Sequence, residues 1–192
     1  MANRELTYYV ATSIDGYIAG PAGQFDAFPI PPDVSAAMNE ARPETVPTAY
    51  RAPAGLADAP NRLYDTVLMG RGTYLPGLAE GHPSPYAHLR QYVFSSTLDP
   101  AIAEDVVFTA ADPVAVVRDL KRQQGKGIWL CGGGRLAGAL IGEIDEIVVK
   151  RYPLVFGGGI PMFAGTYVPT GFTLTDDRAF DSGAAVQTYR KA

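Results

Sequence analysis

The segment 128–137 places an apolar strand, three consecutive glycines and a helix-like pattern in immediate succession. Residues 128–131 have the apolar character of a buried strand, and Arg135 opens a pattern typical of a helix. The glycines at 132–134 allow a tight turn and free backbone N–H groups to approach an anion, and a helix N-terminus adds the positive end of a dipole. This junction predicts a phosphate site, suited to a dinucleotide.

Strands and helices alternate over most of the remaining chain. The hydrophobic pattern predicts strands at 6–12, 65–69, 91–95, 105–109, 127–131 and 146–151. Helices are expected at 71–79, at 112–124 with Asp112 as the N-cap, and at 135–141. Two further segments, 172–178 and 184–189, predict a closing hairpin about residues 181–183. This order indicates an α/β protein with a mostly parallel sheet and one antiparallel edge.

Residues 20–60 interrupt this rhythm with eight prolines and few periodic signals. Only 33–41 has a helical pattern there, with Asp33 as the expected N-cap. Because 192 residues suffice for one sizeable core, we expect a single domain over 1–192 with a Pro-rich insert at about 29–60. So long an irregular stretch is typical of an active-site lid or of a contact between subunits, and the sequence leaves both open.

Composition limits the classes of partner. The net charge of −4, with no cluster of Lys and Arg, gives no support for nucleic-acid binding. The segment 1–5 does not resemble a signal peptide, and no apolar run has the length of a membrane span. The single cysteine, Cys131, fits a reducing compartment, so we expect a cytoplasmic protein. His82 and His88 lack metal-ligand spacing, so we expect both to be solvated and predict no metal site.

Two other strand ends carry groups suited to an anion. Gly70, Arg71 and Thr73 follow one predicted strand, and Ser95 and Ser96 follow the next. In a parallel sheet these ends lie at one edge, where ligands bind, so the three segments together predict a site.

Each segment taken alone has a simpler explanation. The serines are then a turn, Arg71 is a solvated side chain, and the glycines serve strand–helix packing. The segment 128–137 is also an incomplete Rossmann fingerprint. Lys150 and Arg151 end the next strand, where that fingerprint requires an acidic residue.

The segments 13–19, 68–74, 93–96 and 130–135 resemble, in the same order, motifs of the dihydrofolate reductase-like superfamily. The resemblance is nearer to the reductase domain of riboflavin biosynthesis (the RibD C-terminal domain) than to dihydrofolate reductase itself, since 153–159 is similar to a loop of the riboflavin-type reductases. It implies a three-layer fold with a mostly parallel central sheet, helices on both faces and an antiparallel C-terminal hairpin. It also implies a homodimer.

The resemblance further implies NADPH as the cofactor. The residues that it assigns to NADPH are Ala11, Ile18, Gly70, Arg71, Thr73, Ser95, Ser96, Gly132, Gly133, Gly134, Arg135 and Leu136. Among them, Arg71 would face the adenosine 2′-phosphate with help from the two serines, giving a preference for NADP over NAD. The glycine segment would wrap the pyrophosphate, with the bond between residues 132 and 133 in the cis form. Ala11 and Ile18 would lie against the nicotinamide.

The substrate side matches less well. Asp33, after two prolines, stands where the folate enzymes carry the carboxylate that pairs with the pterin, although an N-cap would use the same residue. Asp15 is a second candidate polar group near the nicotinamide, unless it only stabilises its turn. Cys131 would point toward the substrate, or it is a small buried residue. Val149 and Ala137 replace a hydroxyl and a tyrosine of the folate enzymes, which argues against folate as the substrate.

These features predict an NADPH-dependent reductase that transfers hydride to a small heterocyclic or carbonyl-containing compound. One alternative is the ribosylamino-pyrimidine reductase of the riboflavin pathway. Against it, the chain lacks the zinc motif of a deaminase domain, and the insert alters the substrate side. The other alternative is a non-catalytic NADP-binding protein, which the sequence does not exclude because no catalytic acid is certain. In each case the partner is a small molecule, with no nucleic acid and no membrane.

Overall fold

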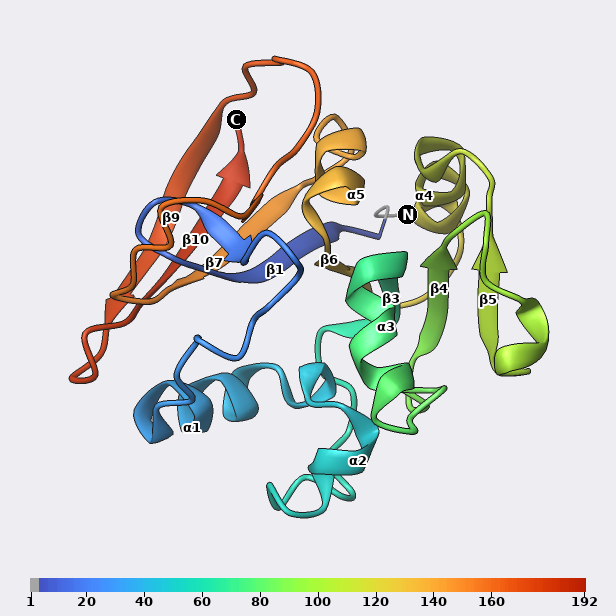
Figure 1. Cartoon of the computed structure of the whole chain (residues 1–192), viewed down its shortest axis with the longest axis horizontal. Helices are drawn as coiled ribbons and strands as arrows, with labels where there is room; N and C mark the ends of the chain where they lie inside the picture. Colours follow the sequence, from blue (N-terminus) through green and yellow to red (C-terminus); the bar gives the residue numbers. More distant parts are fainter. Residues whose placement is uncertain (1–3) are drawn as a thin grey trace.

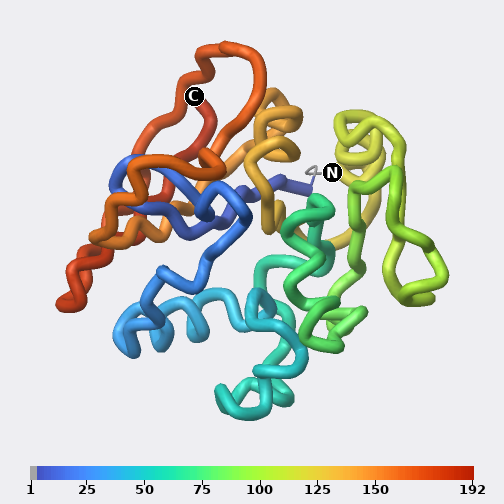
Figure 2. Tube along the Cα trace, in the orientation of Figure 1, coloured from blue at the N-terminus to red at the C-terminus, as the bar shows by residue number. Residues whose placement is uncertain are grey.

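An eight-stranded sheet runs through the centre of the protein (Figures 1 and 2), in a computed structural model that describes residues 4–192. The strand order is β5-β4-β3-β6-β1-β7-β10-β9. All neighbours from β5 to β7 are parallel, whereas β10 is antiparallel to both β7 and β9. This confirms the expected α/β class with a mostly parallel sheet and a C-terminal hairpin. Residues 1–3, part of the segment for which no signal peptide is expected, lie outside the described residues.

The strands of this sheet lie within two residues of their predicted spans. They are β1 (Leu6–Thr12), β3 (Tyr64–Gly70), β4 (Arg90–Phe94), β5 (Val106–Thr109), β6 (Gly127–Gly132), β7 (Glu146–Arg151), β9 (Phe172–Ala179) and β10 (Ala185–Lys191). The sequence analysis missed β2 (Tyr17–Ala19) and β8 (Ile160–Pro161), which form a separate antiparallel pair. They are too short to show an alternating pattern, so only their mutual pairing defines them as strands.

The helices α3 (Arg71–Ala79) and α4 (Pro113–Arg122) lie where the sequence predicts them. Asp112 caps α4, because its carboxylate accepts the N–H groups of Val114 and Ala115, each at 3.2 Å. Helix α5 (Gly134–Ala139) begins one residue earlier and ends two residues earlier than expected.

The insert contains α1 (Pro32–Ala41), close to the helix expected there. The expectation of no other helix in the insert is wrong, because it also contains α2 (Thr48–Arg51) and the 3₁₀ helix η1 (Pro43–Thr45). A second 3₁₀ helix, η2 (Pro100–Ile102), follows β4. The prediction that Asp33 is the N-cap of α1 is wrong. The N-cap is Pro31, and it makes no side-chain capping bond. Pro32 occupies the first helical position, since its fixed φ suits a helix start and the missing N–H costs nothing there.

Helices cover both faces of the sheet, as predicted. Figure 1 shows α1 and α2 below the sheet and α4 and α5 above it. Neighbouring strand residues point to opposite faces. Val67 therefore packs in the core between the sheet and α1 and α3, whereas Leu68 packs in the core between the sheet and α4 and α5. Val34 of α1 and Val117 of α4 belong to these two separate cores. The sheet is therefore the middle of three layers.

Buried polar contacts fix the second half of the insert to the sheet. Glu44 is fully buried, and its Oε1 accepts the N–H groups of Leu63 (2.6 Å) and Tyr64 (2.7 Å) at the start of β3. The guanidinium of Arg51, also buried, donates to the carbonyl oxygens of Pro43 and Ala59. The insert is thus a packed layer in which α1 covers one face of the sheet.

Candidate functional site

Three parallel strands end at the same level of the sheet. In the register of β3 with β4, Gly70 pairs with Phe94, and in the register of β3 with β6, Met69 pairs with Gly132. The residues that follow these strands therefore meet at one edge of the sheet. We call this place the glycine edge, formed by Gly70, Arg71, Thr73, Ser95, Ser96 and the segment 132–136.

The glycine turn lies directly against the start of α3. A Cβ atom built on Gly70 would lie 3.5 Å from the backbone N of Gly133. The Thr73 Oγ1 atom would lie 3.5 Å from a Cβ atom built on Gly132 and 3.6 Å from a Cβ atom built on Gly133. Ile18 of β2 reaches the same turn, with its Cδ1 at 3.8 Å from the Cβ position of Gly133. The peptide bond between residues 132 and 133 is cis. The structure thus brings segments from four strands into one surface.

Two helices begin at this surface without a side-chain cap. The N-cap residues are Gly70 for α3 and Gly133 for α5, and neither helix start has a side-chain capping bond. The first N–H groups of a helix have no acceptor inside the helix. Backbone donors of two helix starts therefore face the same region, and such donors suit phosphate oxygens.

The structural reason for a glycine differs among the three positions of the turn. Gly132 has a φ of 135°, a conformation that favours glycine. A Cβ on Gly133 would make only ordinary van der Waals contacts, 3.6 Å from Thr73 Oγ1 and 3.8 Å from Ile18 Cδ1, so packing within the protein does not require a glycine there. A Cβ on Gly134 would lie 2.1 Å from the carbonyl oxygen of Pro161. Packing against β8 therefore explains Gly134, whereas no close contact explains Gly133.

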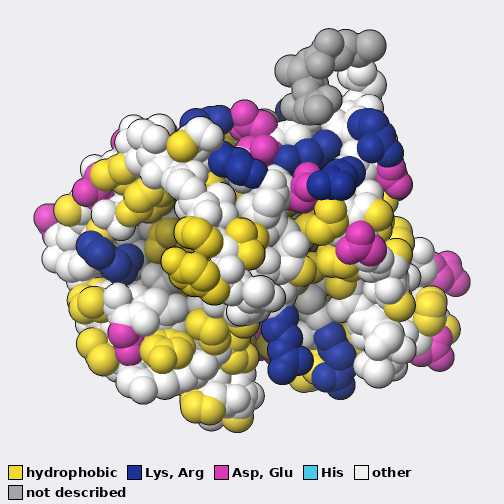
Figure 3. All heavy atoms as spheres, turned by 90° about the horizontal axis from the view of Figure 1, so that it is seen from above, with side chains coloured by type: hydrophobic (Ala, Val, Ile, Leu, Met, Phe, Trp, Pro, Cys, Tyr) yellow, Lys and Arg dark blue, Asp and Glu magenta, His cyan; other side chains and the backbone are white. Residues whose placement is uncertain are grey.

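Two arginines at the glycine edge have no hydrogen-bond or ion-pair partner among the described residues. Arg71 and Arg135 are exposed, and neither makes a hydrogen bond or ion pair within residues 4–192. Within the same range five other basic residues pair with carboxylates, among them Lys121 with Asp145 at 2.6 Å. Figure 3 shows such mixing, with Lys and Arg interspersed with Asp and Glu on the upper part of the face. The two free guanidinium groups are therefore available to an anion.

The two serines after β4 differ in the hydrogen bonds that their side chains make. The Ser95 Oγ atom accepts the N–H groups of Thr97 (3.1 Å) and Leu98 (3.2 Å), which closes the turn after the strand. Ser96 is exposed and is placed beside it at the same strand end. Both serines lie level with Arg71, since the strands that precede them are paired.

The sheet face beneath α1 carries a cation that the sequence analysis did not single out. Lys150 pairs in register with Ala11 of the neighbouring strand, so both side chains point to the same face. The Nζ atom of Lys150 lies 4.5 Å from the ring centroid of Tyr9. Tyr152 and Cys131 lie close by, and both act on the pKa of Lys150. We call this place, formed by Tyr9, Ala11, Cys131, Lys150 and Tyr152, the lysine face.

A sequence signal for Lys150 did exist. Val148, two residues earlier on the same side of β7, packs in the core beneath α1. A lysine therefore occupies a position where alternation predicts an apolar side chain, and a charge there calls for an explanation. The sequence analysis weighed this lysine only as a departure from a Rossmann pattern.

The sequence profile described as the RibD C-terminal domain matches residues 4–187. The chain belongs to the RibD C-terminal domain family. It is 30% identical over 188 residues to the Bacillus subtilis (strain 168) protein YwjB, covering 97% of each chain. Among solved structures it is similar to a putative riboflavin biosynthesis protein from Shewanella sp. PV-4, with a TM-score of 0.71 and 24% identity over 98% of this chain and 99% of that one. It is also similar to dihydrofolate reductase from Enterococcus faecalis complexed with NADP(H), with a TM-score of 0.64 and 15% identity over 99% and 98%.

The match confirms the resemblance drawn from the sequence motifs. The two structural neighbours share the fold, and a reductase-like fold is therefore established for this RibD C-terminal domain. Within residues 4–192, no helix is long and apolar enough to cross a membrane. In that same range no group of three or more His, Cys, Asp or Glu side chains is placed to hold a metal ion.

Both carboxylates proposed as catalytic in this RibD C-terminal domain are bound to backbone N–H groups. Asp33 accepts from Val34 (2.8 Å) and from Ser182 (3.0 Å), which connects α1 to the turn of the C-terminal hairpin. The bond from Ser182 is the main cause that lowers the pKa of Asp33. A carboxylate held ionised in this way is a poor proton donor at neutral pH.

Asp15, in the turn after β1, is likewise bound to backbone N–H groups. Its two oxygens accept the N–H groups of Phe156 (3.1 Å) and Gly157 (2.8 Å). A hydrogen bond with Ser13 is the largest cause that lowers the pKa of Asp15, and these two backbone bonds lower it further. Asp15 thereby links the turn after β1 to the glycine loop at 157–159.

Cys131 lies on the lysine face but has the properties of a packed residue. Burial raises the pKa of its thiol to about 12, and a hydrogen bond with Tyr86 and the charge of Lys150 offset only part of that rise. A thiol with so high a pKa is protonated and unreactive at neutral pH.

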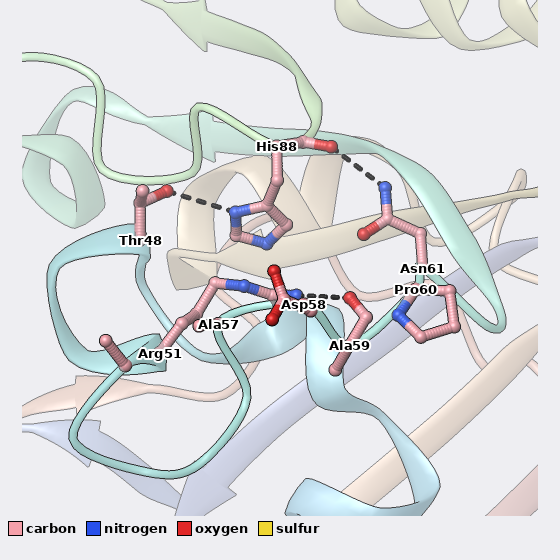
Figure 4. A pocket seen from close by; sticks show the side chains of 9 residues that line it. Thr48, Arg51, Ala57, Asp58, Ala59, Pro60, Asn61 and His88 are labelled. Carbon is pink, nitrogen blue, oxygen red and sulfur yellow. Dashed lines mark hydrogen bonds between the residues drawn. The ribbon is translucent and has the colours of Figure 1, made fainter.

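A hollow of about 480 Å³ lies away from both places, between α2 and the segment 57–61 (Figure 4). The prediction that His88 is simply solvated is wrong. Its Nδ1 lies 3.0 Å from Thr48 Oγ1, its Nε2 lies 2.8 Å from the carbonyl oxygen of Glu44, and its own carbonyl accepts from Asn61 at 2.8 Å. These contacts join the insert to the segment before β4, so Thr48, Asn61 and His88 are already used within the fold.

Proposed function

We propose that this protein is an NADPH-dependent reductase of small heterocyclic or carbonyl-containing compounds. The observation that carries the proposal is the convergence, at the glycine edge, of two uncapped helix starts and two unpaired arginines. Neutral ligands do not need such an arrangement, whereas the pyrophosphate and 2′-phosphate of NADPH do. The Enterococcus faecalis neighbour, a reductase complexed with NADP(H), supports the same interpretation.

The charges and the backbone donors of the glycine edge suit the phosphate groups of the cofactor. The backbone of Gly133 and the other backbone donors of 132–136 would hold the pyrophosphate. Arg71, with Ser95 and Ser96 beside it, would bind the 2′-phosphate.

The nicotinamide would lie further along the same surface, and when bound it supplies the hydride. Ile18, which touches the glycine turn, and Ala11, which lies on the lysine face, would hold its ring. Lys150 and Tyr9 lie on the same face of the sheet as Ala11, so a substrate placed against the nicotinamide would lie beside them.

Aromatic side chains would exclude water on the substrate side. The ring of Phe28, from the start of the insert, lies 5.5 Å from that of Tyr152 and 5.1 Å from that of Phe156. These rings form a wall next to Lys150. The chain thus contributes orientation and a protected site.

Calorimetric titration of the protein with NADPH and, separately, with NADH tests the proposal. Tight NADPH binding with weak NADH binding is the expected result, because only NADPH carries the 2′-phosphate. A subsequent screen of NADPH consumption against heterocyclic and carbonyl acceptors would identify the substrate. Absence of binding by either nucleotide would overturn the reductase assignment while leaving the fold unaffected. NADPH binding without turnover on any acceptor would favour the alternative of a non-catalytic NADP-binding protein.

The family match favours a second candidate, the ribosylamino-pyrimidine reductase of the riboflavin pathway. An assay with that pyrimidine separates it from the first. We further infer a homodimer in the cytoplasm, and light scattering after gel filtration would measure the oligomeric state.

A further inference from the structure

Lys150 is a partly buried cation without an acidic partner. None of the ion pairs found in residues 4–192 includes it. Removing a charge from water is costly unless the charge is paired, so an unpaired lysine under α1 requires a reason.

The surroundings of Lys150 keep its positive charge. Burial acts to lower the pKa of Lys150, but Tyr9, which also shares a side-chain hydrogen bond with Lys150, acts together with Tyr152 and Cys131 to raise it above its ordinary value. The Tyr9 ring also attracts the ammonium group through its face, with Nζ 4.5 Å from the centroid. The Arg42 guanidinium lies over the same ring at 5.5 Å, so two cations share one aromatic side chain.

The nearest carboxylates are occupied elsewhere. Asp33 lies near Tyr152 but directs both oxygens to backbone N–H groups. Glu146, which acts on Arg42 from the other end of β7, pairs with Arg190 at 2.9 Å. No carboxylate among residues 4–192 therefore pairs with Lys150, which lies beside the wall of aromatic rings that begins at Phe28.

We propose that Lys150 determines the specificity of the substrate site, and that this site takes a flat aromatic or heterocyclic compound bearing a carboxylate or another anionic oxygen. The anionic oxygen would meet Lys150 Nζ, and the flat ring would pack against the side chains of Phe28 and Tyr152. The inference rests on the proposed reductase function, because Ala11, the register partner of Lys150, marks the nicotinamide side.

The test compares two probes with the same ring system, quinoline-4-carboxylate and its neutral amide, quinoline-4-carboxamide. Binding is measured calorimetrically in the presence of saturating NADPH. Fluorescence of Trp129, the single tryptophan, gives a second readout, because its ring lies 6.3 Å from that of Tyr9. We expect the carboxylate to bind about tenfold more tightly than the amide, the gain typical of one charge-assisted contact.

Three variants make the result specific. Lys150→Met keeps an unbranched chain without the charge and should remove the preference for the carboxylate. Lys150→Arg keeps the positive charge and should retain the preference for the carboxylate. This variant still tests the inference if Lys150→Met does not fold. Lys126→Met, at an exposed lysine, serves as the matched control and should behave like the wild type.

Equal affinity for the two probes in the wild type, or a preference that survives in Lys150→Met, would overturn the inference. Titration with NADPH alone separates this failure from that of the proposed function. Unchanged NADPH affinity in the variants leaves the reductase proposal standing, whereas a wild type that binds no NADPH removes both.

Discussion

The glycine edge and the lysine face lie side by side but are built in different ways. The glycine edge consists of residues that follow directly on three parallel strands, so its parts are local in sequence and are aligned by strand register. The lysine face joins strand positions to the insert and to the loop after β7, through contacts such as that of Phe28 with Phe156. A ligand site made of strand ends is visible in the sequence, whereas one made of packed faces depends on which elements come together.

Adjacent glycines offer the sharpest way to test whether the glycine edge is a ligand site. Gly133→Val should leave the fold intact, because a Cβ there meets nothing closer than 3.6 Å, yet it should weaken NADPH by at least about 100-fold by filling the phosphate space. Gly134→Val should instead lower the Tm by roughly 5–10 °C, since its Cβ would lie 2.1 Å from a carbonyl oxygen. Calorimetry and thermal melting measure the two effects. Unchanged NADPH affinity in Gly133→Val would make the turn purely structural.

Arg71→Ala addresses the charge of the same edge. We expect NADPH affinity to fall about 10- to 100-fold and NADH affinity to change little, because the lost guanidinium would contact only the 2′-phosphate. Arg122→Ala, at an exposed arginine of α4 paired with Asp119, is the matched control and should leave both affinities unchanged. An equal loss of both nucleotides in Arg71→Ala would contradict the 2′-phosphate assignment.

Asp33→Asn sharpens the description of the lysine face by testing whether this carboxylate supports the fold. The bond from Ser182 lowers the pKa of Asp33 in the folded protein, so the ionised form contributes stability above the unfolded pKa of about 3.9. That contribution is lost as the pH falls through the folded pKa. The variant should therefore melt roughly 1–3 °C lower than the wild type at pH 7, with a difference that vanishes in acid.

Thermal melting from pH 3 to pH 7 measures this effect, and Asp26→Asn, at an exposed aspartate of the insert, provides the control. A loss of turnover in Asp33→Asn with no change in melting would instead restore the catalytic interpretation of Asp33.

Cys131 gives the smallest expected effect. Because burial raises the pKa of its thiol to about 12, labelling by iodoacetamide at pH 8 should be slow in the folded protein and fast after denaturation. Cys131→Ala should leave NADPH affinity unchanged. Rapid labelling that NADPH blocks would instead place the thiol in contact with ligand.

The sequence by itself determined the sheet and the glycine edge. Periodicity located the main strands to within two residues, and Asp112 with Pro113 located the start of α4, because both signals depend on neighbours a few positions apart. Gly70, Arg71, Ser95 and Gly133 can be grouped from their positions in the chain, since parallel strands bring their ends to one edge.

Only the tertiary structure decided the role of the insert and the composition of the lysine face. Asp33 and His88 each had a plausible local explanation, yet their hydrogen bonds go to Ser182 and Thr48, 149 and 40 positions away. The alternation of β7 marked Lys150 as unusual, but the packing alone showed that its neighbours are tyrosines. Contacts between residues so far apart are set by packing of whole elements, which no local pattern encodes.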